Sequence, residues 1–228
     1  EKFNSNTNFP VENLLISNSM VMRDIQFVKI SLIPFNYNSG NSTLEIFDNV
    51  EFEITEIDNP NFVESQVSKP SQVFEKLYSD VISNYSTREE EDYQDPAILY
   101  ICGGSIENNS DFQDLVEWRK QRGFTVYTAS VSSIGSSTNA IKSYIQNAYE
   151  NFDPTPEYVA LVGDVDGSYS IPTYQGSSYG FGHNSYNNDC EGDHPYSQLD
   201  GNDLYPEVLV GRMSVRESSD LAVVVNKI

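Results

Sequence analysis

Two strand-like runs in the second half of the chain end in residues that could do chemistry. The apolar run Tyr158–Val162 stops on Gly163-Asp164, and a second run returns as Leu209-Val-Gly-Arg212. In open α/β sheets, ligands bind beyond the carboxyl ends of the strands. The pair therefore predicts the floor of a site on such a sheet.

The loop between these runs has the composition that calcium prefers. Its acids alternate with Gly, Asn and Ser, and carboxylate and carbonyl oxygens on a flexible backbone are typical calcium ligands. No EF-hand loop is completed, so we expect either a structural calcium ion of another kind or solvated acids. The acids are Asp164, Asp166, Asp189, Glu191, Asp193, Asp200, Asp203 and Glu207.

The possible nucleophiles and bases are poorly placed. His183, His194 and Cys190 all lie in the polar loop, whereas a catalytic Cys and His need rigid strand ends. Cys102 lies in an apolar run; we favour two free thiols over a disulfide with Cys190. Gly103-Gly104 lacks the third glycine of a dinucleotide-binding fingerprint and predicts a simple turn.

Composition narrows the class of protein. The 228 residues carry a formal charge of −21, and so acidic a surface repels the phosphates of nucleic acids. No apolar run is long enough to span a membrane. Abundant Asn, Ser and Tyr favour a secreted or cell-surface protein. The first residue, Glu1, suggests a piece of a longer precursor from which any secretion signal has been removed or left out.

The elements that position these residues fall into three predicted segments. Residues 1–58 alternate apolar and polar side chains over 25–35 and 44–57, with Asn38-Ser-Gly40 between them, which predicts a β-hairpin in a small β-rich domain. Residues 59–95 hold a helix just after Pro70, with Phe74, Leu77, Tyr78 and Val81 on one face, followed by an acidic linker. Residues 96–228 form the domain that carries the two acid-tipped runs.

The linker has one basic residue, Arg88, in the charged run 86–92. A charged run without an apolar anchor is expected to be exposed and mobile, and proteases cut such linkers. Arg88 is therefore a candidate processing site; the alternative is a plain solvated linker.

Residues 96–228 alternate strands and helices. Strands are predicted at 97–101, 124–128, 158–162 and 208–210, with a helix capped by Ser110 and Gln113, a helix over 141–152, and a last helix capped by Ser214 and Glu217. This rhythm predicts an α/β fold with a mainly parallel sheet covered on both faces.

A family resemblance follows from the order and spacing of motifs over about the last 130 residues. Asp111–Phe124, Ile141–Ile145, Glu157–Asp164 with Ile171-Pro172, and Leu199–Asp203 with Pro206–Arg212 resemble the first part of a gingipain-type cysteine peptidase domain, family C25. The segments Met22-Arg23-Asp24, 34–38 and 44–54 resemble the end of its propeptide.

The resemblance implies a caspase-like three-layer fold, secretion, calcium sites and an endopeptidase in which a His assists a Cys thiolate. In that family the His follows a later strand and the Cys the strand after it, so both are expected beyond Ile228. Gly182-His183 comes before the Val-Gly-Arg strand and does not take this role. The predicted metal ligands are Asp164 and Asp193, joined by Asp200 and Asp203.

The sequence thus predicts part of a secreted cysteine endopeptidase precursor, or zymogen, that acts on proteins or peptides, pairs with its own propeptide and is inert as this fragment. The alternative from another class is a non-catalytic, calcium-stabilised surface binding module on a peptidase-like fold.

Overall fold

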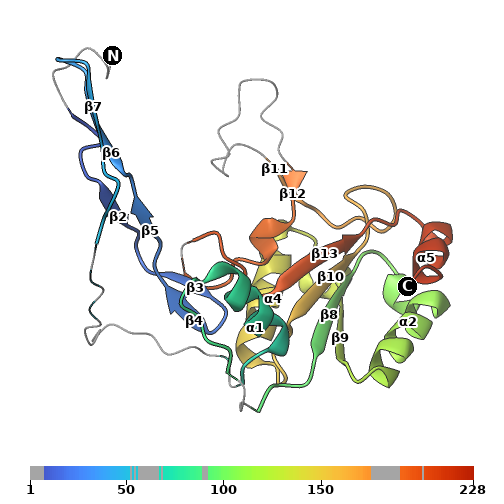
Figure 1. Ribbon diagram of the computed structural model, residues 1–228. Coiled ribbons are helices and arrows are strands. Elements are labelled where there is room, and N and C mark those ends of the chain that lie inside the picture. Colours follow the sequence, from blue (N-terminus) through green and yellow to red (C-terminus); the bar gives the residue numbers. More distant parts are fainter. Residues whose placement is uncertain are drawn as a thin grey trace. The chain divides into compact units, whose positions relative to one another are not determined.

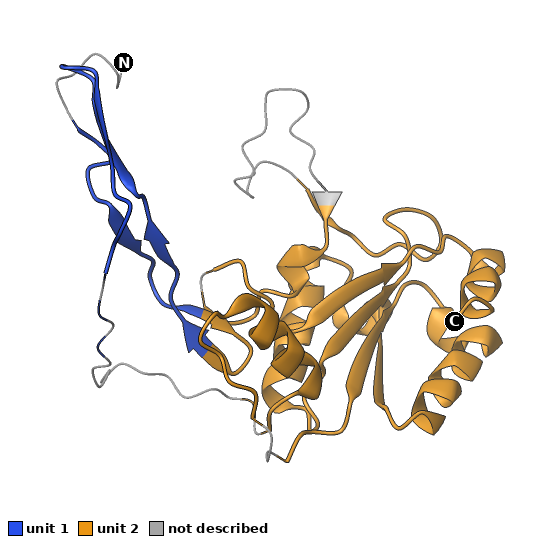
Figure 2. Ribbon diagram, in the orientation of Figure 1, with its two compact units in different colours: residues 1–20, 26–64 blue, residues 21–25, 65–228 orange. Residues whose placement is uncertain are grey.

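The computed structural model describes residues 8–51, 53, 55, 67, 69–88, 92–175, 191–201 and 203–228. The chain forms two compact units, which Figure 2 colours separately: unit 1 comprises residues 1–20 and 26–64, and unit 2 comprises residues 21–25 and 65–228. The turn at residues 21–25 therefore packs with the C-terminal part of the chain.

Unit 1 is built from short antiparallel strands. They are β1 (Asn8–Phe9), β2 (Leu14–Ile16), β5 (Ile30–Leu32), β6 (Phe35–Asn38) and β7 (Thr43–Ile46). β6 lies between β1 and β7, and β2 pairs with β5. β3 (Met20–Met22) and β4 (Ile25–Phe27) pair with each other and flank the turn that belongs to unit 2.

The predicted hairpin is confirmed where β6 meets β7 across Asn38, whose side-chain oxygen accepts hydrogen bonds from the backbone N–H groups of Gly40 and Asn41. The predicted strand over 25–35 is wrong as a single element, because turns divide it into β4, β5 and the start of β6. β7 ends at Ile46, and the described residues between 47 and 55 form no strand, although Phe52 and Ile54 lie outside the described part.

Unit 2 contains a four-stranded parallel sheet in the order β13-β10-β8-β9. The strands are β8 (Ala97–Cys102), β9 (Thr125–Ser130), β10 (Tyr158–Val162) and β13 (Leu209–Met213). All six residues of β8 are buried, as expected for a central strand covered on both faces. The four strands confirm the predicted parallel sheet.

Helices cover both faces of this sheet (Figure 1). On one face α4 (Thr138–Asn151) packs Ile141 and Ile145 against Leu99 and Ile101 of β8. On the other, α2 (Ser110–Gln121) and α5 (Ser218–Val225) pack against Tyr100 and Cys102. Alternate residues of β8 thus feed two separate cores, which is the period of a strand.

The remaining elements connect these layers. They are α1 (Gln72–Val81), the short helices η2 (Ile106–Asn108), α3 (Val131–Ile134) and η3 (His194–Tyr196), and the paired strands β11 (Tyr174–Gln175) and β12 (Glu191–Gly192). α1 begins after Pro70 as predicted, with Ser71 as N-cap and with Phe74 and Tyr78 buried.

Two predicted helix caps are wrong. α2 is capped by Asn109, whose side chain accepts from the N–H groups of Asp111 and Phe112, while Ser110 is already helical. α5 begins at Ser218 after Glu217, which makes no side-chain cap, so Ser214 lies before the helix. The predicted cap lies one residue inside α2 and three residues before the N-cap of α5, because several nearby polar residues can cap a helix and backbone geometry decides between them.

Among the described residues no helix is long and apolar enough to cross a membrane.

Candidate functional site

The carboxyl edge of the sheet is the predicted site floor. Backbone hydrogen bonds continue past the strand ends: Gly163 N donates to Met213 O at 3.0 Å, Asp164 N to Val215 O at 3.0 Å, and Gly103 N to Val162 O at 2.9 Å. The turns after β8, β10 and β13 are therefore tied into one surface. The predicted neighbourhood of Gly163-Asp164 and the Val-Gly-Arg strand is confirmed, because β10 and β13 pair with each other.

The loop that holds Tyr169 and Ile171 packs closely against this edge because the residues that it meets there are glycines. A Cβ on Gly103 or on Gly163 would lie 2.1 Å from the carbonyl oxygen of Tyr169, a distance that no side chain tolerates. Gly163 also has a φ of +153°. Ile171 N donates to Asp164 O at 2.7 Å and holds the loop in place. Glycine is required at both positions by close backbone approach.

Arg212 organises the same edge from β13. Its Nε and Nη2 each lie 2.7 Å from a carboxylate oxygen of Asp193, a bidentate pair, and Nη1 donates at 3.0 Å to the carbonyls of both Gly163 and Ile171. Its side chain is 11% exposed. Arg212 thus satisfies two carbonyls of the loop while neutralising Asp193.

A second arginine lies further out. Arg216 Nε lies 2.6 Å from Asp166 Oδ1 and 3.3 Å from Asp164 Oδ2. The hydrogen bond from Arg216 lowers the pKa of Asp166. The Arg216–Asp166 pair is more than half exposed, so it contributes less than the more shielded Arg212–Asp193 pair.

The four predicted calcium ligands do not come together. Asp164 and Asp193 lie at the carboxyl edge, each with an arginine. Asp203 instead accepts hydrogen bonds from the N–H groups of Val21 and Tyr205, and Asp200 accepts from Gly201 N. The N–H of Asp200 donates to Glu207, two residues before β13, so the second pair lies near the amino edge.

The two pairs are thus separated by the length of β13, on the order of 15 Å for five residues. The described residues contain no group of three or more His, Cys, Asp or Glu that could hold a metal ion. As placed, these aspartates do not fit one calcium ion. Asp189 lies outside the described part.

Sequence reasoning named Glu207 only among the acids of the loop and gave it no role of its own. Its side chain is fully buried; Oε2 accepts from Leu199 N at 2.6 Å and Asp200 N at 3.1 Å, while Oε1 has no partner among the described residues. Burial raises its pKa to about 7. Glu157 is buried in the same way before β10, and burial raises its pKa too. A repeated Pro-Glu before β10 and β13 was the available signal.

Arg88 departs from the prediction of an exposed linker residue. Its guanidinium Nε lies 2.6 Å from Glu75 Oε1 and its Nη2 lies 2.8 Å from Asp24 Oδ2, and both carboxylate side chains are nearly buried. Burial alone would lower the pKa of Arg88, but these two partners outweigh it and raise it. Tyr93 Oη donates to the Arg88 carbonyl. Buried carboxylates require a counter-ion, and Arg88 supplies it.

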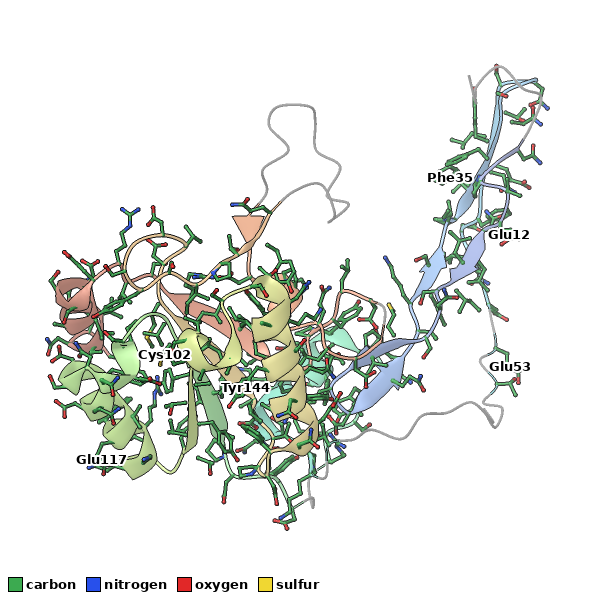
Figure 3. All side chains as sticks on the ribbon, turned by 180° about the vertical axis from the view of Figure 1, so that it is seen from behind. Glu12, Phe35, Glu53, Cys102, Glu117 and Tyr144 are labelled. Carbon is green, nitrogen blue, oxygen red and sulfur yellow. The ribbon has the colours of Figure 1, made fainter. Side chains whose placement is uncertain are left out.

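The thiol and imidazole groups give no nucleophile and base pair in the described part of the chain. Cys102 ends β8 within unit 2 as a free thiol (Figure 3), and burial raises its pKa to about 12, so little of it is thiolate at neutral pH. His194 Nε2 donates to Leu204 O at 2.8 Å. Cys190 and His183 lie outside the described residues.

Comparison with known proteins adds a family to this geometry. Residues 91–228 match Peptidase family C25, and residues 1–93 match Propeptide_C25. Gingipain R2 of Porphyromonas gingivalis is 28% identical over 228 residues, covering 97% of this chain and 29% of the relative. Gingipain R1 of the same organism is 26% identical over 226 residues, covering 97% of this chain and 21% of the relative.

Among solved structures, one described as a protease matches with a TM-score of 0.49 and 24% identity, covering 66% of this chain and 30% of that one. A complex of the pro- and mature domains of Porphyromonas gingivalis RgpB matches with a TM-score of 0.47 and 28% identity, covering 57% and 28%. The chain therefore spans less than a third of the length of these curated relatives and solved chains.

Proposed function

The chain belongs to peptidase family C25, and from this we propose that it is part of a secreted cysteine endopeptidase precursor that acts on proteins or peptides. One observation carries the proposal: the propeptide match and the peptidase match divide the chain and meet at residues 91–93, just after Arg88. In this reading the chain holds a front segment, a candidate processing site and the first strands of a peptidase sheet.

The position of β13 in the sheet supports the proposal that further strands, carrying the catalytic residues, extend this sheet. β13 is an edge strand, with β10 as its only strand partner among the described residues. A further parallel strand added to β13 would bring its carboxyl end next to Gly163-Asp164 and Arg212. We propose that the family's His and Cys stand at the ends of such added strands, in a caspase-like sheet, with the His assisting attack of the Cys thiolate on the peptide carbonyl.

The fragment itself is proposed to be inert. Residues 1–228 should neither hydrolyse peptide substrates nor be labelled at cysteine by a thiol-directed peptide probe, whereas a chain extended through the added strands should do both. Cys102→Ala and Cys190→Ala serve as controls in the fragment. Turnover by the fragment that is abolished by Cys190→Ala would contradict the proposal.

Processing after Arg88 is proposed to require release of its side chain. In the extended precursor, Arg88→Gln should abolish cleavage at this bond, read by sequencing the new N-terminus, while Arg122→Gln, at the exposed end of α2, should not. Glu75→Gln should accelerate the same cleavage, because it weakens the hold on the guanidinium. Unchanged cleavage in Arg88→Gln would rule out this site.

A structural calcium ion stays a proposal for the acidic loop between β10 and β13, with no ligand set assigned. A ligand that binds only the folded chain raises its melting temperature by mass action. Calcium at millimolar concentration should raise the melting temperature of this chain, with magnesium as control, and no shift would count against a site.

A further inference from the structure

Arg23 is buried to an unusual degree. Its relative exposure is 0%, although arginine is almost never fully buried unless its charge is compensated. Its backbone φ is +54°, in the left-handed region that non-glycine residues rarely occupy. The residue lies in the turn at 21–25, which belongs to unit 2. A buried charge and a strained backbone at one position are both unfavourable, so contacts with the surrounding residues must hold Arg23 in this conformation.

The guanidinium is received by a ring of oxygen acceptors. Nη1 donates to Pro156 O at 3.1 Å and to Glu207 O at 2.9 Å. Nη2 donates to Thr155 O at 3.2 Å and to Gln94 Oε1 at 3.3 Å. All four acceptors precede β8, β10 or β13, so the site lies at the amino edge of the parallel sheet.

Two aromatic rings complete this site. The guanidinium carbon lies 5.0 Å from the ring centre of Phe74 and 5.8 Å from that of Tyr149, within cation–π range. Tyr149 Oη also donates to the Arg23 carbonyl at 3.1 Å. A planar, multiply donating group between rings is what arginine offers and lysine does not.

Neighbours of Arg23 strengthen the attachment. Val21 N donates to Asp203 Oδ2 at 2.8 Å, and Met22 is buried. Tyr78 Oη donates to the Met22 carbonyl at 3.2 Å. Most of the groups that receive this turn, namely Gln94, Tyr149, Thr155, Pro156, Asp203 and Glu207, come after residue 92, whereas the turn itself comes before Arg88.

We propose that Arg23 is the anchor by which the segment before Arg88 stays bound to residues 92–228 once the chain is cut between them. The receptor is a guanidinium-binding site at the amino edge of the sheet, and its partner is an arginine-bearing turn. The proposal takes the cut from the proposed function but requires no peptidase activity from the chain.

The Arg23 anchor is separate from the place that we propose for the catalytic groups. The anchor lies at the edge opposite to Gly163-Asp164, where we place the catalytic groups. The hydrogen bonds of the Arg23 guanidinium involve no residue of the carboxyl edge, and cleavage after Arg88 removes a covalent link without removing any of these bonds.

The test uses the complete chain with a specific protease site in place of residues 89–91. After cutting, the two pieces of the unaltered chain should co-elute in size-exclusion chromatography at micromolar concentration. Arg23→Ala should weaken their association roughly 100-fold, the scale of a buried anchor residue, and they should separate. Lys29→Ala removes an exposed basic residue of the same segment and should leave co-elution unchanged.

Arg23→Lys keeps the charge but loses the planar fork, and should weaken association roughly 10-fold. Near-ultraviolet circular dichroism before cutting shows whether each variant is folded; if Arg23→Ala is not, Arg23→Lys carries the comparison. Equal association in Arg23→Lys and the unaltered chain, or separation of the unaltered pieces, would overturn the anchor. Because the cut is made by an added protease, an inactive peptidase would not affect this result.

Discussion

The two edges of the parallel sheet each hold an arginine, by different means. At the carboxyl edge Arg212 faces a carboxylate, Asp193, and retains some contact with solvent. At the amino edge Arg23 is fully buried against backbone carbonyls and rings, beside Glu207, whose pKa is raised. The carboxyl edge thus pairs its arginine with an opposite charge, whereas at the amino edge the charge of Arg23 is met by neutral oxygens and aromatic rings.

The largest loss of stability is expected when the Arg212–Asp193 pair at the carboxyl edge is broken. Arg212→Ala leaves Asp193 and two loop carbonyls without their donor and should lower the free energy of unfolding by about 3–5 kcal/mol, measured by urea denaturation. Arg216→Ala, which removes the exposed arginine of the same edge, should change it little. Equal losses in both would show that burial does not distinguish the two arginines.

The next largest loss of stability is expected where two backbone segments approach closely at the carboxyl edge. Gly163→Ala places a Cβ against Tyr169 O and should cost roughly 2–4 kcal/mol of unfolding free energy. Gly211→Ala on β13 is the matched control, because a Cβ there meets nothing within 4 Å. A neutral Gly163→Ala would mean that the loop over the edge moves freely.

Glu207 makes the amino edge sensitive to pH. Its pKa is about 7 in the folded chain against 4.5 as its ordinary value, so the folded state binds this proton more tightly. The resulting stabilisation is complete below pH 4.5 and is lost as the pH rises towards 7, by up to roughly 3 kcal/mol.

Glu207→Gln should remove this loss in unfolding measured from pH 4 to 8. Asp166→Asn is the control: the pKa of Asp166 is lowered from its ordinary 3.8, so its contribution stays present from pH 4 to 8 and is lost only on further acidification. If the pH dependence of Glu207→Gln matches that of the unaltered chain, the glutamate is already ionised in the folded state at pH 5.

The smallest effect removes one bond from the anchor. Tyr149→Phe keeps the ring and deletes the hydrogen bond to the Arg23 carbonyl, so the unfolding free energy should fall by about 1 kcal/mol in thermal denaturation. Tyr144→Phe, on the same helix (Figure 3), is the comparison, since among the described residues no hydrogen bond is found for its hydroxyl. A loss as large in Tyr144→Phe would contradict a specific role for the Tyr149 bond.

Local sequence pattern was enough to predict most helices and strands and the position of Gly163-Asp164 at the carboxyl edge. Apolar runs of strand length and helical spacing predicted the four parallel strands, α1 and α4, because burying one face requires that spacing in any fold. Gly163-Asp164 could be placed at a strand end for the same reason. The caps of α2 and α5 were misplaced, because neighbouring polar residues offer alternatives that differ by little energy.

The electrostatic partners could not be predicted in the same way. Arg88 looked like a solvated linker residue until the fold placed Glu75 and Asp24 beside it. The acidic loop looked like one ligand cluster, yet β13 separates Asp164 and Asp193 from Asp200 and Asp203. Sequence distance within a loop says little about distance in space when the loop spans both edges of a sheet.

By itself the sequence determined the α/β class, the order of strands along the chain, the acidic balance and the family motifs, since these depend on composition and short-range spacing. Only the tertiary structure decided that Arg23, which lies 133 residues before Pro156, donates to its carbonyl. A buried charge is stable only where many distant acceptors converge, and their convergence is a property of the folded chain.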